Sequence, residues 1–443
     1  MAGIIDFFRL LYHRRFWTKQ QIVQYQISQL NHLLRHSRDH AAYYRDTIPK
    51  SSVKSLTDFQ TLPIINKRIM MEHFDQINTV GLKREEVMDY AIQKELSQDY
   101  LGYYKDEYVI GLSSGTSGNK GLYITPKDLT KKLPFVFLAR SGIPLRILPY
   151  RILFMLRVFS QGFDDINSFL ISLKYLSTMT PVDQIITAIQ SNNINILMAP
   201  PSLMRLLLPV ADQIKAQLKM IVTYAEVLES EEKQRLVKTF GCRVIEIYQG
   251  SEGQFASACN HGNLHINEDL VFVELLDEQY QVVNTPHMVA RHMIITNLVN
   301  HAQPLIRYEM NDLIVLDEPC PCKSNFRRIK NILGRNDDIL YFKTKKNTIQ
   351  HIFPDLFSRW IITTSESIRE YQVHQGDDHD LTITIDPIDP CDHDRLVADL
   401  KTRLHRELDV YDIEAVIEIH LTSITLPSDR SKYKRFTVSK STI

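Results

Sequence analysis

A short apolar strand that runs directly into a loop of serine, threonine and glycine is the feature that most constrains this chain. Tyr108–Leu112 reads as the strand, and residues 113–118 are all Ser, Thr or Gly, followed closely by the cation of Lys120. Glycines let backbone N–H groups approach an anion, and hydroxyls add further donors. Loops of this kind hold phosphates, although the spacing differs from the Walker pattern. A mobile Ser/Gly turn is the alternative interpretation.

Length, composition and charge limit the kinds of protein that this chain can be. At 443 residues it is too long for one ordinary core, and we expect two or three lobes. Hydrophobic residues make up 44% and charged residues 23%, as in globular proteins. The formal net charge is zero, which gives no global field for nucleic acid. Five cysteines, an odd number, suit a reduced cytoplasmic protein better than a disulfide framework.

The N-terminal segment is aromatic and basic. Residues 7–17 combine Phe8, Tyr12 and Phe16 with three arginines. We expect an amphipathic helix packed on its own domain, and the alternative is a helix that lies on a membrane surface. Asp6 precedes the arginines, which is the reverse of a signal peptide, and no apolar run approaches the length of a membrane span.

Strand-like and helix-like patterns alternate through the middle of the chain. The predicted strands cover residues 152–158, 194–198, 219–224 and 243–248, and the predicted helices cover residues 181–191, 201–208 and 230–240. This alternation predicts a parallel sheet with crossover helices, in which ligands bind at the carboxyl ends of the strands. We also expect a helix over residues 19–38 and a β-rich region over residues 264–316.

The loop after Leu112 resembles the phosphate loop of adenylate-forming enzymes, the acyl-CoA ligase superfamily. The resemblance implies that ATP is bound, and that its phosphates contact Ser113, Ser114, Gly115, Thr116, Ser117, Gly118 and Lys120. Many members carry one more residue, usually proline, before the lysine. The loop of this chain is therefore shorter by one residue.

Two later segments resemble the adenine and ribose motifs of the same superfamily. In residues 247–253 the match implies that Tyr248 flanks the adenine, Ser251 contacts the α-phosphate and Glu252 holds Mg²⁺, a role that suits a carboxylate. An ordinary glycine turn with a solvated glutamate is the alternative. Before another strand, Asp312 matches the residue that accepts hydrogen bonds from the ribose hydroxyls.

One position of the ribose motif departs from the superfamily pattern. Asn311 stands where glycine is usual. Asparagine is the next residue able to adopt a positive φ, so we expect the turn before Asp312 to be preserved. A surface turn is the alternative interpretation of Asp312 when it is considered alone.

The remaining motifs lie toward the end of the chain. Residues 334–338 resemble the superfamily hinge, in which Arg335 reaches the ribose or a phosphate and a following aspartate is the pivot. The basic tail resembles the segment whose lysine completes the adenylation site. Lys432 is the better match for this catalytic lysine and Lys434 is the reserve. A solvated run of charge is the alternative interpretation of the tail.

Four thiol and imidazole groups have a spacing that suits zinc. Cys259 precedes His265 by six positions, and Cys320 and Cys322 follow later in the chain. Two sulfurs one residue apart, with a Cys and a His from another hairpin, complete a tetrahedral Zn²⁺ set. His261 is an alternative to His265, and unligated cytoplasmic thiols are the alternative to a metal site. Phenylacetate–CoA ligase-like relatives often carry a similar arrangement, and we expect a closed structural site.

Taken together, the motifs imply an α/β fold with two parts. A large N-terminal adenylation domain, residues 1–335, has mostly parallel sheets and a β-rich subdomain, and a mobile α+β lid domain covers residues 336–443. The nearest resemblance is to proteins related to phenylacetate–CoA ligases and to deazaflavin-adenylylating synthetases. It implies that Glu252 and Lys432 support catalysis.

The implied activity is activation of a carboxylic acid, possibly aromatic, as an acyl-adenylate. Transfer to a thiol, either CoA or a carrier protein, would follow. The alternatives are a nucleotidyltransferase that leaves AMP on its acceptor and a catalytically silent relative that kept the fold. Residues 199–202 and 224–227 are expected to line the acid pocket because they follow predicted strands.

Overall fold

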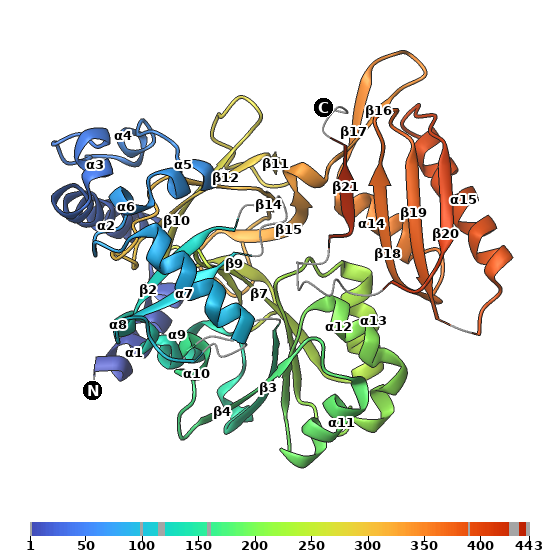
Figure 1. Ribbon diagram of the computed structural model, residues 1–443, viewed down its shortest axis with the longest axis horizontal. Coiled ribbons are helices and arrows are strands. Elements are labelled where there is room, and N and C mark those ends of the chain that lie inside the picture. The colour runs from blue at the N-terminus through green and yellow to red at the C-terminus, as the bar shows by residue number, and fades with distance from the viewer. Residues whose placement is uncertain are drawn as a thin grey trace.

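The computed structural model describes residues 2–97, 101–113, 120–156, 161–388, 390–424 and 434–439. Its centre is a ten-stranded sheet with the order β11-β14-β15-β9-β8-β7-β6-β5-β3-β4 (Figure 1). One half of this sheet is parallel and the other half is antiparallel. Strand β7 belongs to both halves, because its neighbour β6 is parallel to it and its neighbour β8 is antiparallel.

The parallel half consists of strands joined by crossover helices. Its strands are β3 (Tyr150–Leu156), β4 (Ile171–Ser177), β5 (Ile196–Met198), β6 (Met220–Thr223) and β7 (Arg243–Gly250), and its helices are α11 (Val182–Ser191), α12 (Pro201–Leu207) and α13 (Ser230–Phe240). In β3, Leu153 packs with the core that these helices cover, whereas Ile152 packs into the core on the opposite face. Side chains alternate between faces along a strand, so both faces of β3 are buried, as its apolar run predicted, whereas the edge strand β4 is exposed on one face.

The antiparallel half begins with a hairpin between β7 and β8. Its strands are β8 (Gly253–Ala258), β9 (Leu264–Ile266), β11 (Val289–Ala290), β14 (Asp312–Leu316) and β15 (Arg328–Arg335). The hairpin turn holds Ser251 and Glu252. The large sheet is therefore mixed, with the predicted parallel strands in one half and antiparallel strands in the other.

Two smaller sheets complete the region around the turn. The hairpin of β1 (Tyr108–Leu112) and β2 (Leu122–Pro126) encloses the Ser/Gly loop, and an antiparallel sheet contains β10 (Val271–Leu276), β12 (His292–Asn297) and β13 (Tyr308–Met310). Short helices α8 (Lys127–Thr130), α9 (Leu133–Arg140) and α10 (Gln161–Asp164) follow the first hairpin. The β-rich region predicted over residues 264–316 is confirmed.

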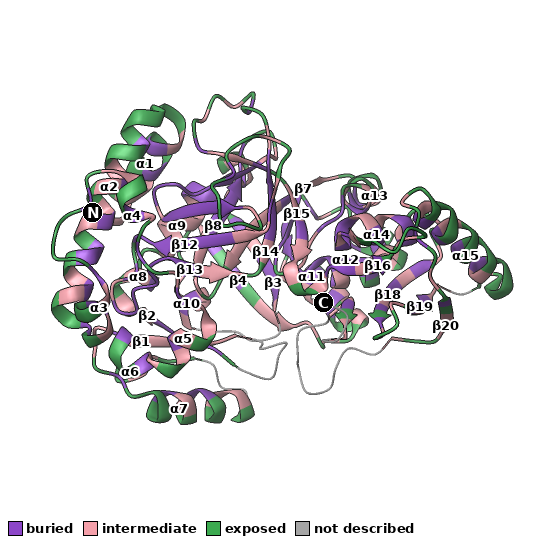
Figure 2. Cartoon of the chain, turned by 90° about the horizontal axis from the view of Figure 1, so that it is seen from above, coloured by how far each residue is buried: buried purple, intermediate pink, exposed green. Residues whose placement is uncertain are grey.

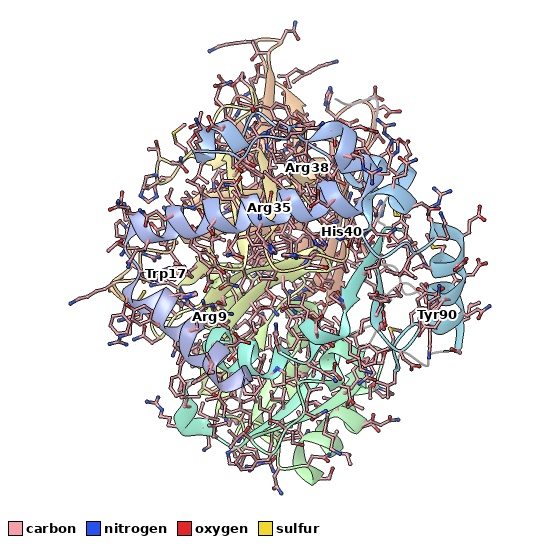
Figure 3. All side chains as sticks on the ribbon, turned by 90° about the vertical axis from the view of Figure 1, so that its left-hand side faces the viewer. Arg9, Trp17, Arg35, Arg38, His40 and Tyr90 are labelled. Carbon is pink, nitrogen blue, oxygen red and sulfur yellow. The ribbon has the colours of Figure 1, made fainter. Side chains whose placement is uncertain are left out.

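The chain begins with helices that lie across one side of the molecule (Figure 3). They are α1 (Ala2–Phe16), α2 (Lys19–His40), α3 (Ala42–Thr47), α4 (Leu56–Phe59), α5 (Lys67–Glu72), α6 (Phe74–Ile77) and α7 (Arg84–Ser97). A capping box formed by Thr18 and Gln21 begins α2, and such a box satisfies two helix-end N–H groups. In the described ranges, no helix combines the length and the apolar character needed to cross a bilayer.

Helix α1 differs in one respect from the sequence prediction. We expected its apolar stripe to pack on the protein, but the packed side carries Leu10 and His13, whereas Phe8, Tyr12 and Phe16 are exposed. Figure 2 shows the exposed outer side of α1. Periodicity identifies a stripe but not the direction in which it faces. Here polar anchors on the opposite side determine that direction.

The end of the chain forms a lobe with its own core, which we call the C-terminal lobe. It contains β16 (Leu340–Lys343), β17 (Ile349–Ile352), α14 (Pro354–Ile362), β18 (Ile368–Gln375), β19 (Leu381–Pro387), α15 (His393–Asp409), β20 (Ile417–Leu421) and β21 (Phe436–Val438). Its four-stranded sheet has the order β20-β19-β18-β21, with α14 and α15 packed against it (Figure 1). The predicted α/β fold with a small C-terminal sheet is confirmed. The boundary at residues 335 and 336 stays a prediction.

Buried ion pairs join the C-terminal lobe to the large sheet's helices. Arg205 on α12 pairs with Glu232 on α13 and with Glu370 on β18, and Arg435 pairs with Glu370 at 2.8 Å. Removing one member of a buried pair leaves an uncompensated charge, which costs about 3–5 kcal/mol. These contacts therefore favour the observed arrangement of the lobes.

Candidate active site

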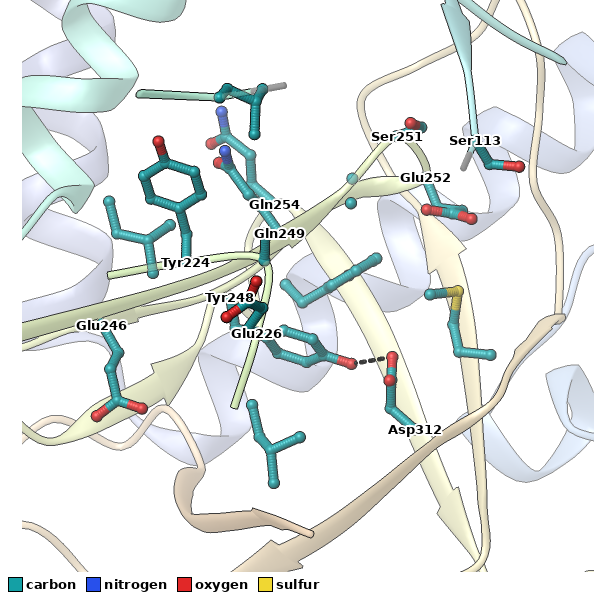
Figure 4. Close-up of a pocket in the computed structure, with 18 of the residues that line it drawn as sticks. Ser113, Tyr224, Glu226, Glu246, Tyr248, Gln249, Ser251, Glu252, Gln254 and Asp312 are labelled. Carbon is teal, nitrogen blue, oxygen red and sulfur yellow. Dashed lines mark hydrogen bonds between the residues drawn. The ribbon is translucent and has the colours of Figure 1, made fainter. Parts of the chain in front are cut away.

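A cavity of about 1190 Å³ lies at the ends of strands of the large sheet, beside the C-terminal lobe. Its wall includes the ends of β1, β6, β7 and β15 and the residues before β21. Every predicted nucleotide-binding residue within the described ranges lines this cavity: Ser113, Lys120, Tyr248, Ser251, Glu252, Asp312 and Arg335. The structure therefore brings together side chains from segments that are far apart in the sequence (Figure 4).

Glu252 is held in place by neighbours on three other strands. Its Oε1 accepts a hydrogen bond of 2.7 Å from the Tyr123 hydroxyl, which lies 3.1 Å from the Tyr308 hydroxyl. Asn297 donates from Nδ2 to the backbone oxygen of Glu252 at 2.8 Å. Burial raises the pKa of Glu252, and the Tyr123 hydroxyl partly offsets this. A carboxylate in such a place is stabilised by an added cation.

Asp312 forms the second fixed carboxylate. The Tyr248 hydroxyl donates to its Oδ2 at 2.7 Å (Figure 4), and the Arg335 Nε lies 3.9 Å from its Oδ1. Strands β14 and β15 place Asp312 opposite Arg335. Burial lowers the pKa of Arg335, but the charges of Asp312 and the hinge aspartates outweigh burial and raise it. The guanidinium therefore stays charged beside Asp312.

Lys434 of the basic tail forms ion pairs with the two aspartates of the predicted hinge. Lys434 Nζ lies 3.3 Å from an Asp337 oxygen and 2.9 Å from an Asp338 oxygen. Asn311 donates from Nδ2 to Asp337 at 2.7 Å. The expectation for Asn311 is corrected, because its φ is not positive; its amide joins the turn to the hinge instead. Lys432 lies outside the described residues.

The neck of the predicted phosphate loop is closed by two hydrogen bonds. Ser113 N donates to Gly121 O at 2.9 Å, and Gly121 N donates to Ser113 Oγ at 2.8 Å. Lys120 forms an ion pair with Glu95. The other loop residues, Ser114, Gly115, Thr116, Ser117 and Gly118, lie outside the described ranges, so their contacts with phosphate stay a prediction.

Sequence reasoning missed two residues beside Glu252. Tyr123 stands 129 positions before it, in a strand with no motif that marks a tyrosine as functional. Lys67 lies near Glu252, where burial lowers the pKa of its ammonium and the carboxylate of Glu252 opposes this effect. The connector before Lys67 is fixed because Ile65 exchanges backbone hydrogen bonds with the ribose-motif segment. The Leu-Pro-x-x-x-Lys pattern of this connector was the available signal.

The segments expected to line an acid pocket also face this cavity. Residues 224–227 and Pro200 and Ser202 contribute to its wall. Ala225 has a φ of +67°, and the turn that it makes at the end of β6 presents Glu226 to Ser202. A left-handed alanine is uncommon and marks a backbone held by its surroundings.

A second cluster lies at the far end of the antiparallel strands. The sulfurs of Cys259 and Cys320 are 3.8 Å apart, and Cys322 Sγ is 3.4 Å from His265 Nε2. All four ligand atoms lie within 4.8 Å of one another. Zn–S bonds of about 2.3 Å in a tetrahedron place sulfurs about 3.8 Å apart, so the donor set fits zinc.

His265 is oriented as a metal ligand. Its Nδ1 lies 2.8 Å from Phe326 O, so the neutral ring donates from Nδ1–H and leaves Nε2 directed at Cys322. Burial lowers the pKa of His265 to about 4, which keeps the ring neutral. A backbone acceptor of this kind is the usual partner of a ligating histidine.

Comparison with known proteins identifies the fold. No family model matches the chain. Among curated proteins, protein CapK of Staphylococcus aureus is 21% identical over 393 residues, which cover 83% of this chain and 79% of CapK. This identity is low and does not by itself assign an activity.

Several of the similar solved structures are CoA ligases. A 2-hydroxyisobutyryl-CoA ligase in the postadenylation state, bound to an acyl-AMP, has a TM-score of 0.75 at 16% identity and covers 97% of this chain and 92% of its own. The same ligase with CoA in the thioesterification state has a TM-score of 0.60 at 17% identity, covering 96% and 91%. An anthranilate CoA ligase reaches 0.55 at 13% identity, covering 73% and 65%. The chain therefore has the fold of acyl-CoA ligases.

We propose that Cys259, His265, Cys320 and Cys322 form a closed structural zinc site. Purified protein is then expected to contain about one zinc ion per chain, because four protein ligands complete the tetrahedron. Replacing Cys320 and Cys322 by serine should remove most of this zinc and lower the melting temperature, since metal binding contributes to folding stability. Elemental analysis and thermal melting measure both effects.

The chain offers a matched control for this experiment. Cys242 lies outside the cluster, so Cys242→Ser should keep the zinc content of the wild type. Equal zinc in the wild type and in the double-serine variant would contradict the assignment, as would metal-free protein from zinc-supplemented cells.

Proposed function

We propose that this protein uses ATP to activate a carboxylic acid as an acyl-adenylate and then transfers the acyl group to a thiol. The proposal is supported chiefly by one observation: Ser113, Tyr248, Glu252 and Asp312, from three motifs in superfamily order, line the same cavity. The fold, which is that of acyl-CoA ligases, agrees with it. If these residues faced different cavities, the fold alone would support the proposal.

Each part of the nucleotide has a candidate partner in the cavity. Tyr248 would flank the adenine, and Asp312, fixed by Tyr248 and Arg335, would accept hydrogen bonds from the ribose hydroxyls. Ser113 and the loop after it would donate to the phosphates. The Glu252 carboxylate fits Mg²⁺ because it offers a hard oxygen donor and its burial favours a cation nearby.

The proposed reaction has two steps. A carboxylate oxygen of the acid attacks the α-phosphorus of ATP, a new O–P bond forms, and the bond to pyrophosphate breaks. The sulfur of the thiol then attacks the acyl carbon, so that a C–S bond forms and AMP leaves. Mg²⁺, when bound, offsets the charge of the phosphates. The protein mainly has to align the reactants and neutralise charge.

The acid would occupy the apolar end of the cavity. Val136, Phe154, Phe163 and Tyr224 contribute to its wall there. Apolar and aromatic lining favours a ligand with an apolar body, so we propose an aromatic or similarly apolar acyl group. Figure 4 shows Tyr224 at the end of the site opposite Ser113.

The arrangement of the lobes supports the first step in particular. The TM-score is higher against the postadenylation state of the 2-hydroxyisobutyryl-CoA ligase than against its thioesterification state, 0.75 against 0.60. In the thioesterification state, the 2-hydroxyisobutyryl-CoA ligase has CoA bound. We propose that the C-terminal lobe of this chain rotates before CoA, or a carrier-protein thiol, reacts.

Glu252→Gln tests the metal role within the proposed function. The substitution keeps the shape of the side chain but removes its charge, so ATP–pyrophosphate exchange with an accepted acid should fall by about 100-fold or more. Exchange is first measured against a panel of aromatic and aliphatic carboxylic acids to find that acid. Unchanged exchange in the variant would exclude Glu252 from the proposed role.

Glu246→Gln is the matched control for this variant. Glu246 also lines the cavity, but it pairs with Lys233 at 2.8 Å and lies at the opposite end from Glu252 (Figure 4). The exchange rate of this variant should stay within about threefold of the wild type, because the Glu246 carboxylate is paired with Lys233 and has no role in the proposed steps. A loss as large as that of Glu252→Gln would point to a general effect on the cavity.

The two tail lysines should differ in effect. We expect Lys432→Ala to lower exchange by about 100-fold or more, since it removes the charge proposed to stabilise the transition state. Lys434→Ala should lower exchange by less than about 10-fold, because Lys434 pairs with Asp337 and Asp338. The measurement is exchange at saturating ATP, and a larger loss in Lys434→Ala would reverse the two roles.

Mass spectrometry of the products decides what happens after adenylation. With CoA added, the proposal expects an acyl-CoA and free AMP. A product that retains AMP would instead identify a nucleotidyltransferase.

A further inference from the structure

The outer side of α1 is an apolar and aromatic surface. Ile5, Phe8 and Phe16 are 65%, 63% and 60% exposed, values that are unusual for such large apolar side chains. Ile4, Leu11 and Tyr12 are also exposed. Along the helix these residues share one face, because their spacing follows the helical repeat. We call this set, with the exposed Arg9 and Arg15, the outer face of α1.

The outer face is held in its orientation by anchors on the opposite side of the helix. His13 Nδ1 lies 2.9 Å from Asp269 Oδ2, and Arg140 donates to Leu10 O at 2.7 Å while it pairs with Asp269 at 2.6 Å. Asp269 and Arg140 are buried. Rotating the helix to hide its apolar face would leave this buried aspartate without His13, which is costly.

The end of α1 is also fixed, by the segment that carries the metal-site cysteines. Ser324 Oγ donates to Arg14 O at 2.7 Å, and Asn325 Nδ2 donates to Trp17 O at 2.7 Å. Both follow Cys322 closely in the chain. These contacts therefore fix the orientation in which the apolar face of α1 is exposed.

The N-terminal segment that carries this face has a positive net charge. Residues 1–54 contain nine Lys or Arg residues and three Asp residues with no Glu, a net charge of +6, whereas the whole chain has a net charge of zero. On α1, Asp6 is the one acidic residue, and it is paired with Arg9 at 2.8 Å. Arg35 and Arg38 of α2 lie on the same side of the molecule (Figure 3). Apolar and cationic groups therefore share one surface.

We propose that the outer face of α1 docks this protein onto the surface of an anionic lipid bilayer. Helices that lie in the membrane interface combine apolar and aromatic residues with Lys or Arg at the edge, and anionic headgroups attract the basic segment. At 15 residues α1 is about 22 Å long, which is too short to span the hydrocarbon region. It therefore lies along the bilayer surface.

Charge complementarity selects lipid over the other occupants of such a face. A second copy of the chain would bring two segments of net charge +6 together, and like charges repel. An anionic bilayer supplies the opposite charge over a wide area and an apolar layer beneath it. The bilayer therefore matches both the cationic and the apolar residues of the outer face.

Flotation of the full-length protein with vesicles tests the proposal. Vesicles of phosphatidylglycerol and phosphatidylcholine in equal parts should carry the protein, and vesicles of phosphatidylcholine alone should carry much less. Binding should weaken as NaCl rises from ~0.1 M to ~0.5 M because salt screens the attraction. Equal recovery on both kinds of vesicle, or none on either, would overturn the proposal.

Variants of exposed residues separate the contributions without disturbing the core. Replacing Ile5 and Phe8 by serine should lower the partition coefficient by at least ~10-fold through lost apolar burial. Arg15→Gln should lower it by about fivefold on anionic vesicles only. Val410→Ser, at a residue 74% exposed on the C-terminal lobe, is the control and should bind as the wild type does.

Two further outcomes would overturn the lipid proposal. If light scattering finds a dimer that the Ile5→Ser, Phe8→Ser variant abolishes, with no vesicle binding, the face joins two copies and the lipid proposal is wrong. If Val410→Ser reduces vesicle binding as much as the α1 variant does, adsorption is non-specific and the proposal is also wrong.

Discussion

Two hydrogen bonds from tyrosine hydroxyls to carboxylates organise the site. Tyr123 holds Glu252, and Tyr248 holds Asp312. Each bond joins strands of different sheets or hairpins, so the positions of the carboxylates depend on the packing of the whole large lobe. A hydrogen bond to an ionised acceptor is stronger than a neutral one. The two acidic groups are thereby fixed relative to each other before any ligand binds.

The topology explains why these groups meet. Strand β7 ends the parallel half of the sheet and turns directly into the antiparallel half. The turn carries Ser251 and Glu252, and the last antiparallel strands return Asp312 and Arg335 to the same edge. A change of strand direction at this point opens a crevice at the carboxyl ends of the strands. The C-terminal lobe, held by Arg205, Glu370 and Arg435, covers it.

Part of this could be predicted from the sequence. Four of the five parallel strands were predicted, because strands such as β3 and β5 are buried on both faces and read as continuous apolar runs. The edge strand β4 was not predicted, because exposed Ser172 and Lys174 interrupt its apolar residues. The motif residues that line the cavity were predicted because their residue types follow the superfamily motifs in the same order along the chain. The metal cluster was found from the spacing of Cys and His.

The rest depends on contacts that leave no local pattern. Nothing near Tyr123 in the chain indicates that its hydroxyl meets Glu252, and a tyrosine in a short strand is usually a core residue. Asn311 was expected to adopt a positive φ, but its amide found a partner in Asp337. The stripe on α1 was visible in the sequence, whereas its outward direction depends on Asp269, which lies more than 250 residues away.

The proposed function requires one pocket that accepts Mg·ATP, and titration calorimetry tests this most directly. Adding Mg·ATP to the purified protein should give a saturable heat for one site, with a Kd between about 1 μM and 1 mM, the range in which enzymes hold their substrates. Removing the magnesium with EDTA should weaken the binding. An absence of saturable heat at millimolar nucleotide, with the protein folded, would contradict the account.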